Sequence, residues 1–138
     1  MQGLLADVNV QAHLAYLRHL LIFLDLWPVL AELNVRFVTF AELQLSPEML
    51  DRPLWNYCQA EGWVLFTENR NQDDADSLEA TLKDSGRMGH LPVLTLANKS
   101  RFEHQRDYAV RVAADVAELM FGISQGEYTH QGRIYVPR

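Results

Sequence analysis

Cysteine is scarce in this sequence. Cys58 is the only one, so the 138-residue chain cannot form an internal disulfide. A chain without disulfides fits a reducing compartment, and we expect Cys58 to pack within a helix as a small apolar residue. The five histidines are scattered without the spacing of metal ligands, so no zinc site is expected.

Positive charge is also in short supply. The chain has 12 Lys and Arg residues against 18 Asp and Glu residues, which gives a formal net charge of −6 and a pI near 5.2. Proteins that bind nucleic acid through its phosphates usually carry a basic face or stripe. A nucleic-acid function would therefore depend on a local basic rim. Four residues near predicted strand ends could form such a rim or simply solvate the surface: Arg70, Lys99, Arg101 and Arg106.

The sequence has no uninterrupted apolar run long enough to span a membrane. The most hydrophobic region, residues 14–33, is broken by Arg18, His19, Asp25, Pro28 and Glu32. The amino terminus also lacks the basic segment, apolar run and small-residue cleavage site of a secretion signal. We therefore expect a cytoplasmic protein with no membrane partner. Region 14–33 is expected to form core, with a dimer surface as the alternative.

The length and composition favour one domain over residues 1–138, because 49% hydrophobic residues are ample for a single buried core. Apolar runs alternate with segments of helical period, which favours a parallel sheet with helices on its faces. Strands are predicted at 4–8, 35–40, 63–67 and 91–96. Helices are predicted from a cap at Asn9, from Asp51 to near Gly62, over 77–84, and over 102–121 with Gly122 as a stop; a hairpin is predicted at 128–136. The expected fold class is a three-layer α/β/α sandwich with a mainly parallel central sheet.

Acidic and amide side chains follow the predicted strands, where open α/β sheets form their sites. Asp7 ends the first strand, Glu42 follows the second, and Asp51 opens the helix before the third. A polar loop after the third strand contains Glu68, Asn69, Asp73, Asp74 and Asp76. Converging carboxylates repel one another unless a cation neutralises them, and hard oxygen ligands suit Mg²⁺ or Mn²⁺. Such an ion can activate water and stabilise charge on a phosphate, as hydrolysis of a phosphodiester requires.

Each of these carboxylates also has an ordinary structural explanation. Asp51 stands where a helix N-cap belongs, and capping alone would account for it. The run 73–76 is commonly a solvated loop or a helix start. Asp7 is harder to explain in this way, because an aspartate at the end of an apolar strand must be hydrated, paired or functional.

The segment 51–69 carries the most specific pattern in the chain. Asp51 opens a helix, Gly62 precedes an apolar strand, and the strand ends in Thr67-Glu68-Asn69, sixteen residues after Asp51. Together with Asp7 after the first strand, this pattern resembles the PIN domains. These are compact metal-dependent nucleases that include the toxins of many bacterial toxin-antitoxin pairs. The resemblance spans nearly the whole chain and implies a PIN-like fold.

The resemblance also implies roles for individual residues. Asp7 and Asp51 would be catalytic metal ligands, and Asp73 or Asp74 would be a further ligand or would position the attacking water. Thr67 and Asn69 would shape the site by hydrogen bonding. Glu42 is the candidate for the second acidic ligand, with Glu48 as the alternative.

The implied activity is an Mg²⁺- or Mn²⁺-dependent ribonuclease, toxin-like, that hydrolyses RNA phosphodiester bonds. Its substrate would be single-stranded or structured RNA, with single strands favoured because their bases can stack on aromatics such as Trp55 or Phe102. Arg70, Lys99 and Arg101 would bind the RNA. An antitoxin protein and a second copy of the chain are the expected partners.

Two other functions compete with the nuclease. The acidic balance of the chain favours a catalytically inactive PIN-like module that binds or assembles. A phosphoacceptor receiver domain is the third candidate and fits less well, because its acceptor aspartate ends an apolar strand whereas Asp51 follows a polar connection.

Overall fold

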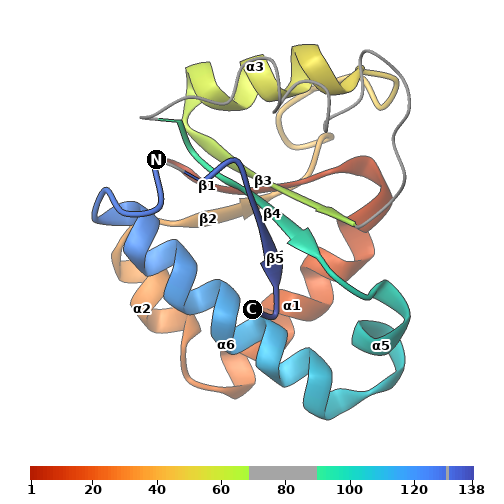
Figure 1. The fold of residues 1–138 in the computed structure, drawn as a ribbon, viewed down its shortest axis with the longest axis vertical. Coiled ribbons are helices and arrows are strands. Elements are labelled where there is room, and N and C mark those ends of the chain that lie inside the picture. Colours follow the sequence, from red (N-terminus) through yellow and green to blue (C-terminus); the bar gives the residue numbers. More distant parts are fainter. Residues whose placement is uncertain (69–89, 130) are drawn as a thin grey trace.

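The structure is a computed structural model that describes residues 1–68, 90–129 and 131–138 (Figure 1). Its centre is one five-stranded sheet with the strand order β2-β1-β3-β4-β5, in which every neighbouring pair runs parallel. The strands are β1 (Gly3–Ala6), β2 (Arg36–Val38), β3 (Trp63–Glu68), β4 (Val93–Leu96) and β5 (Arg133–Val136). The predicted α/β class is confirmed, and the described strands are all parallel.

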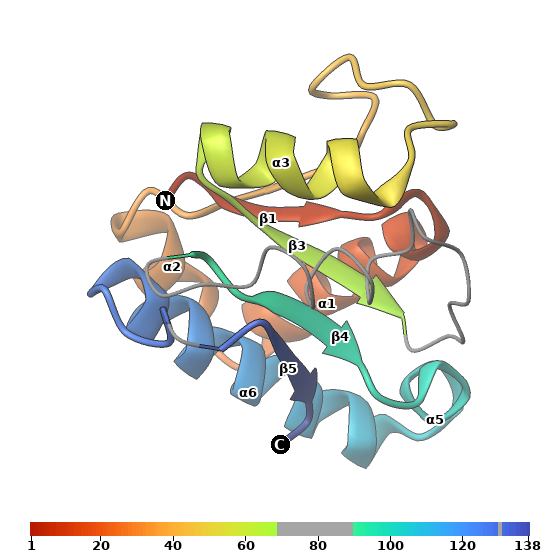
Figure 2. The same cartoon turned by 45° about the horizontal axis from the view of Figure 1, so that its top comes forward.

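Helices cover both faces of the sheet (Figure 2). One face carries α1 (Gln11–Phe23), α2 (Trp27–Glu32) and α6 (Arg106–Ser124), and the other carries α3 (Asp51–Glu61). The remaining described helical segments are the 3-10 turn η1 (Val8–Val10) and the short helix α5 (Lys99–His104), which packs on α6. The layers are compatible with the predicted α/β/α sandwich.

The three central strands, β1, β3 and β4, are buried on both faces, toward which their successive side chains point in alternation. Leu4, Val64 and Leu94 pack toward α1 and α6, whereas Leu5 and Leu65 pack toward α3. Fully burying one such leucine contributes roughly 1.5–3 kcal/mol relative to leaving it exposed. This double burial explains why the strands read as continuous apolar runs rather than as alternating ones.

The hydrophobic region 14–33 contributes mainly to the core, as its helical spacing predicts. Leu14, Leu17, Leu20 and Leu21 of α1 are buried, and so is Leu30 of α2. These five leucines belong to the core cluster that includes α6, and other apolar residues of the region pack partly buried against it: Tyr16, Leu24, Leu26, Trp27 and Leu33. Ile22, Phe23 and Val29 are exposed.

The helix α3 begins and ends where the local signals predict. Asp51 and Pro53 lie in its first turn, where a proline is tolerated because its missing N–H has no helical partner. Gly62 ends it in the left-handed conformation, with φ of 83°. The N-cap residue is Leu50 and no side chain caps the helix, so the alternative explanation of Asp51 as an N-cap is wrong.

The predicted helix 102–121 is two helices, because the chain is extended at Gln105 between α5 and α6. Gly122 does not stop α6, which continues to Ser124. A Cβ atom at Gly122 would come within 2.5 Å of Cε2 of Tyr128. The glycine therefore allows the Tyr128 ring to approach the helix and does not break it.

The predicted hairpin at 128–136 is wrong. β5 pairs with β4 in parallel, with Val93 opposite Arg133 and Thr95 opposite Tyr135. The segment after β5 returns to α6, where the Arg138 guanidinium contacts Oδ1 of Asp115 at 2.7 Å. Residues 133–136 therefore add a fifth parallel strand to the sheet instead of closing a hairpin.

No helix in the described ranges combines the length and the apolar character needed to cross a membrane. The predicted helix at 77–84 lies outside the described residues.

Candidate functional site

The register of the sheet places four polar residues in one row across the strands. Asp7 directly follows β1, and its backbone N–H donates to the carbonyl of Phe66, which continues the ladder beside Thr67. Thr67 lies opposite Thr95, and Thr95 lies opposite Tyr135. Thr67 and Thr95 lie two positions after Leu65 and Val93, which pack on the α3 side. Tyr135 lies two positions after Arg133, which is opposite Val93. Because side chains two positions apart share a face, the row lies on the α3 face of the sheet.

This row holds the buried polar side chains of the described part of the protein. Asp7 is 8% exposed, Thr67 is 4% exposed and Thr95 is fully buried; no other described polar or charged residue falls in the buried class. A buried charge or hydroxyl costs free energy unless it is hydrogen-bonded. The concentration of such groups in one row therefore marks this row as the candidate site.

Asp7 is fixed by its surroundings at the carboxyl end of β1. Its Oδ1 accepts a hydrogen bond of 2.7 Å from the N–H of Val8, and its carbonyl accepts one of 2.9 Å from the N–H of Val10. Asp7 thus caps η1. The predicted helix cap at Asn9 is wrong, because Asn9 lies inside η1 and the N-cap residue of α1 is Val10. These contacts hold the carboxylate at a defined place in the row.

The thiol of Cys58 in α3 is buried, and the charge of Asp7 adds to the effect of that burial. Burial is the main cause that raises the pKa of Cys58 to about 12, and the negative charge of Asp7 raises it further. Cys58 is therefore a neutral residue that packs within a helix, as predicted.

The two threonines and an arginine form a hydrogen-bonded chain along the row. The hydroxyl oxygens of Thr67 and Thr95 lie 3.0 Å apart, and Nη1 of Arg133 donates to the Thr95 hydroxyl at 2.7 Å. The Thr67 hydroxyl is hydrogen-bonded within the row, and its role in shaping a site stays a prediction. Arg133 was missed because its segment read as a hairpin; the alternation of Arg133 and Tyr135 with apolar residues was the available signal.

Asp51 lies at the same edge of the sheet as Asp7, but it belongs to the helix α3. In Figure 2, α3 starts at the side toward which β1, β3 and β4 run, and Asp51 is its first residue. Its side chain is half-buried. The placement agrees with a site at this edge, and its role as a metal ligand stays a prediction.

Glu42 lies apart from the row. Its Oε1 accepts hydrogen bonds from the backbone N–H and the hydroxyl of Thr39, at 3.1 and 3.2 Å. It lines a hollow of about 120 Å³ with Leu14 and Phe37, which belong to the core on the α1 side. The structure thus gives Glu42 a local partner on the side away from α3, and the alternative, Glu48, is exposed.

Three residues of the predicted basic rim have neighbours in the described part of the chain, and their role in binding RNA stays a prediction. Nζ of Lys99 contacts Oε2 of Glu68 at 2.8 Å, so its charge is balanced locally. The guanidinium of Arg101 lies 4.3 Å from the Tyr108 ring, and that of Arg106 lies 4.8 Å from the Phe23 ring.

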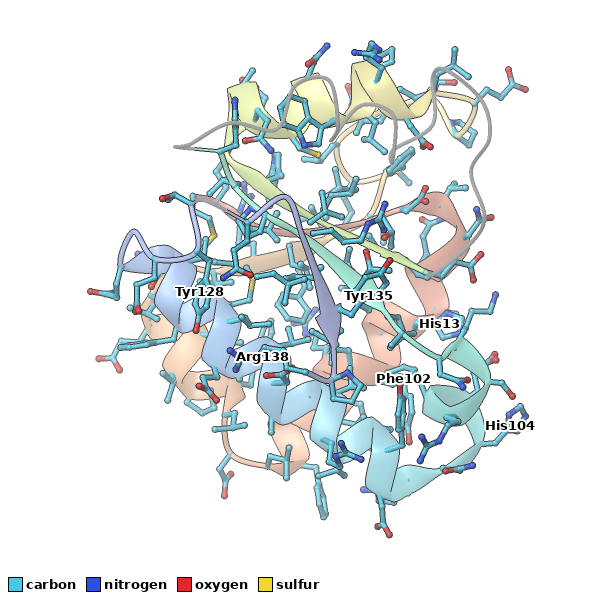
Figure 3. All side chains as sticks on the ribbon, in the orientation of Figure 1. His13, Phe102, His104, Tyr128, Tyr135 and Arg138 are labelled. Atoms are coloured by element: carbon cyan, nitrogen blue, oxygen red, sulfur yellow. The ribbon has the colours of Figure 1, made fainter. Side chains whose placement is uncertain are left out.

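The expected base-stacking aromatics are not available to a ligand. Trp55 is 4% exposed, and Phe102 is fully buried beside His13 (Figure 3). The prediction that they stack on RNA bases is therefore wrong.

Part of the predicted ligand set cannot be placed. Asn69, Arg70, Asp73, Asp74 and Asp76 lie outside the described residues. Within the ranges 1–68, 90–129 and 131–138, no three His, Cys, Asp or Glu side chains lie close enough together to bind one metal ion.

Comparison with known proteins found no matching family model, no matching curated sequence and no matching solved structure.

Proposed function

We propose that the protein is a PIN-like, Mg²⁺- or Mn²⁺-dependent ribonuclease whose site is centred on Asp7. The observation that carries this proposal is the buried Asp7 carboxylate at the carboxyl end of β1, beside Thr67 and on the α3 face of a parallel sheet. This edge is where parallel α/β sheets place their functional groups. The same edge receives Asp51 at the start of α3.

The donor chemistry of these residues fits a hard divalent cation. Carboxylate oxygens are the ligands that Mg²⁺ and Mn²⁺ prefer, and Asp7 and Asp51 would hold the ion, with Asp73 or Asp74 as the proposed further carboxylate. A cation bound there would supply a more acidic water and would offset the charge that builds up on a phosphate under attack.

The chain itself orients the Asp7 carboxylate and surrounds it with buried side chains. The Val8 N–H fixes one oxygen of Asp7, and the Thr67 and Thr95 hydroxyls hold the floor of the row next to it. Leu5, Leu65 and Val93 are buried on the same face of the sheet, two positions earlier in their strands, and border the row with apolar side chains. Side chains fixed in this way keep a site in one geometry through the reaction.

The proposal is tested by incubating the purified protein with RNA and Mg²⁺ or Mn²⁺. Chelation should abolish cleavage, and Asp7→Asn should lower the rate by about 100-fold or more, since loss of outer-shell partners alone typically costs 10–100-fold. Asp25→Asn is the matched control: Asp25 is exposed with φ of 59°, a conformation that asparagine tolerates well. Cleavage by Asp7→Asn at the wild-type rate would contradict the proposal.

A second candidate function is an assembly module without catalysis. It is favoured by four exposed apolar side chains on α1, α2 and α6, namely Ile22, Phe23, Val29 and Phe121. Val29 and Phe121 also line an apolar hollow of about 230 Å³. Exposed apolar patches often mark protein–protein contacts. Self-association that is lost in Phe121→Asp, in a protein that cleaves no RNA, would support this function over the nuclease.

A further inference from the structure

We propose that the chain forms a twofold-symmetric homodimer in which α6 of one copy packs antiparallel on α6 of a second copy, with Ala114 at the centre of the contact. The helix α6 covers the face of the sheet opposite to α3 and the Asp7 row (Figure 2). The inference therefore goes beyond the nuclease and holds whether or not the chain cleaves RNA. It also names a second copy as the partner of the exposed apolar patch on α1, α2 and α6.

The outward side of α6 carries one exposed row of side chains: Asp107, Arg111, Ala114, Glu118 and Phe121. Their separations of three or four residues place them along the same side of the helix. The residue in the middle of this row is an alanine, whose short side chain allows a second helix to come close. The row is thus a helix face on which another helix can pack.

The charges on either side of Ala114 are opposite and almost equally distant from it. Arg111 lies three residues before Ala114 and Glu118 lies four residues after it, or about 4.5 and 6 Å along the helix axis. A twofold axis through Ala114 and perpendicular to the helix therefore brings Arg111 of each copy opposite Glu118 of the other. A parallel arrangement in the same register would instead place like charges opposite each other. The charge pattern thus favours the antiparallel dimer.

Both charged side chains are accessible to a second copy. Arg111 is exposed, its guanidinium carbon lies 6.0 Å from the centre of the Tyr108 ring, and it forms no ion pair with a residue of the described ranges. Oε1 of Glu118 contacts Nη2 of Arg138 at 3.3 Å, but the Glu118 side chain is 70% exposed. A carboxylate has two oxygens that each accept more than one hydrogen bond. Glu118 can therefore accept Arg111 of the second copy and keep its contact with Arg138.

Exposed aromatic side chains lie at the two ends of the same contact. The Phe23 ring is 62% exposed and lies 4.8 Å from the guanidinium carbon of Arg106, eight residues before the centre. Phe121 lies seven residues after the centre and, with Val29, lines the apolar hollow of about 230 Å³. These positions are about 12 and 10.5 Å from the centre along the axis, so the twofold brings Phe23 of each copy to the Phe121 end of the other. Arg106 and Asp107 then lie at the polar rim that surrounds such apolar contacts.

Three features of different chemistry thus agree on one axis: a small central residue, two reciprocal charge pairs and two reciprocal aromatic contacts. A surface that binds its own copy under a twofold axis must be self-complementary in this way. The buried aromatic rings would supply most of the affinity, and the charge pairs would fix the orientation.

The first test is sedimentation equilibrium of the full chain over a range of concentrations, which gives the mass and the dimer Kd. The wild type should approach twice the chain mass of 15.9 kDa. Phe23→Asp should raise Kd about 30-fold, as expected for an aromatic residue that anchors an interface. Leu50→Asp is the matched control, because Leu50 is 57% exposed at the start of α3, on the other face of the sheet, and aspartate is favoured at an N-cap. This control should leave Kd unchanged.

Charge reversal tests the antiparallel pairing itself. Arg111→Glu alone and Glu118→Arg alone each place like charges opposite each other twice, so each should raise Kd about 10-fold. Mixed in equal amounts, the two variants should form a heterodimer with two opposite-charge pairs and a Kd close to that of the wild type. A defect in folding would not be repaired by mixing.

Three outcomes would overturn the dimer: a wild type that stays monomeric at every concentration, a Kd that Phe23→Asp leaves unchanged, or a mixture that associates no better than its components. None of these measurements uses RNA. The assay of Asp7→Asn therefore decides on the nuclease independently of the dimer.

Discussion

The hydroxyl oxygens of Thr67 and Thr95 lie 3.0 Å apart on neighbouring strands, in a layer where both side chains are almost completely buried. The Thr95 hydroxyl also accepts a hydrogen bond from Arg133, so two hydroxyls and a guanidinium form one hydrogen-bonded chain. Asp7 follows β1 beside Thr67 at the end of the same row.

We expect Thr95→Val to destabilise the protein by about 1–3 kcal/mol, because it removes the partner of the Thr67 hydroxyl and the acceptor of Arg133 in a buried layer. Urea denaturation measures the change in free energy of unfolding. Thr39→Val is the control: its hydroxyl bonds Glu42 near the surface, so its loss should cost less. The double variant Thr67→Val with Thr95→Val should cost less than the sum of the single changes; additive costs would show that the two hydroxyls are not coupled.

Asp51→Asn distinguishes a metal ligand from a helix-start residue. As a ligand, Asp51 should support both the cleavage rate and the Mn²⁺ affinity, and both should fall by about 10-fold or more in the variant. As a first-turn carboxylate near the start of α3, it should affect only stability, by about 0.3–1 kcal/mol. Glu48→Gln changes an exposed acid in the preceding connection and serves as the comparison. Unchanged rate and metal affinity in Asp51→Asn would remove it from the ligand set.

The buried thiol gives the protein a stability that depends on alkaline pH. Burial first, and the charge of Asp7 second, raise the pKa of Cys58 from 9.0 to about 12. The unfolded chain therefore loses this proton at lower pH than the folded chain does. The contribution is fully present below pH 9 and is lost as the pH rises from 9 toward 12. In denaturation series across this window, Cys58→Ala should show a flatter fall in stability than the wild type; parallel curves would refute the assignment.

Gly122→Ala tests why a glycine lies inside α6. Alanine favours a helix interior by up to about 1 kcal/mol over glycine. The added Cβ would meet Cε2 of Tyr128 at 2.5 Å, and such overpacking typically costs about 1–3 kcal/mol, so we expect a net loss in thermal stability. In a Tyr128→Ala background the same change should become stabilising, and loss of stability there as well would count against this explanation.

The parts of the fold that the sequence predicts well are those set by local chemistry. The limits of α3 follow from Asp51, Pro53 and Gly62, whose backbone preferences act within a few residues. The position of Asp7 follows from the end of an apolar strand, and burial confirms that this carboxylate is unusual. These signals do not depend on which strands pair.

The parts that could not be predicted depend on contacts between distant segments. Tyr128 contacts Gly122 only because the chain turns back after α6, so the glycine could not be distinguished from a helix stop. Arg133 joins the candidate site because β5 pairs with β4, almost 40 positions earlier in the chain. Neither the pairing nor its parallel direction is encoded in the local alternation of residues 133–136.

The position of β5 also bears on how the protein is made. It is the last strand of the sheet in chain order, yet it covers the edge of β4. During synthesis, β4 and its paired neighbours emerge from the ribosome well before β5, and until then the β4 edge presents unpaired backbone groups of the kind that join other chains. Parallel pairing through a long crossover also closes slowly. Folding intermediates that lack β5 should therefore be the species most prone to aggregate, and the arrival of this strand should complete both the sheet and the row that extends from Asp7.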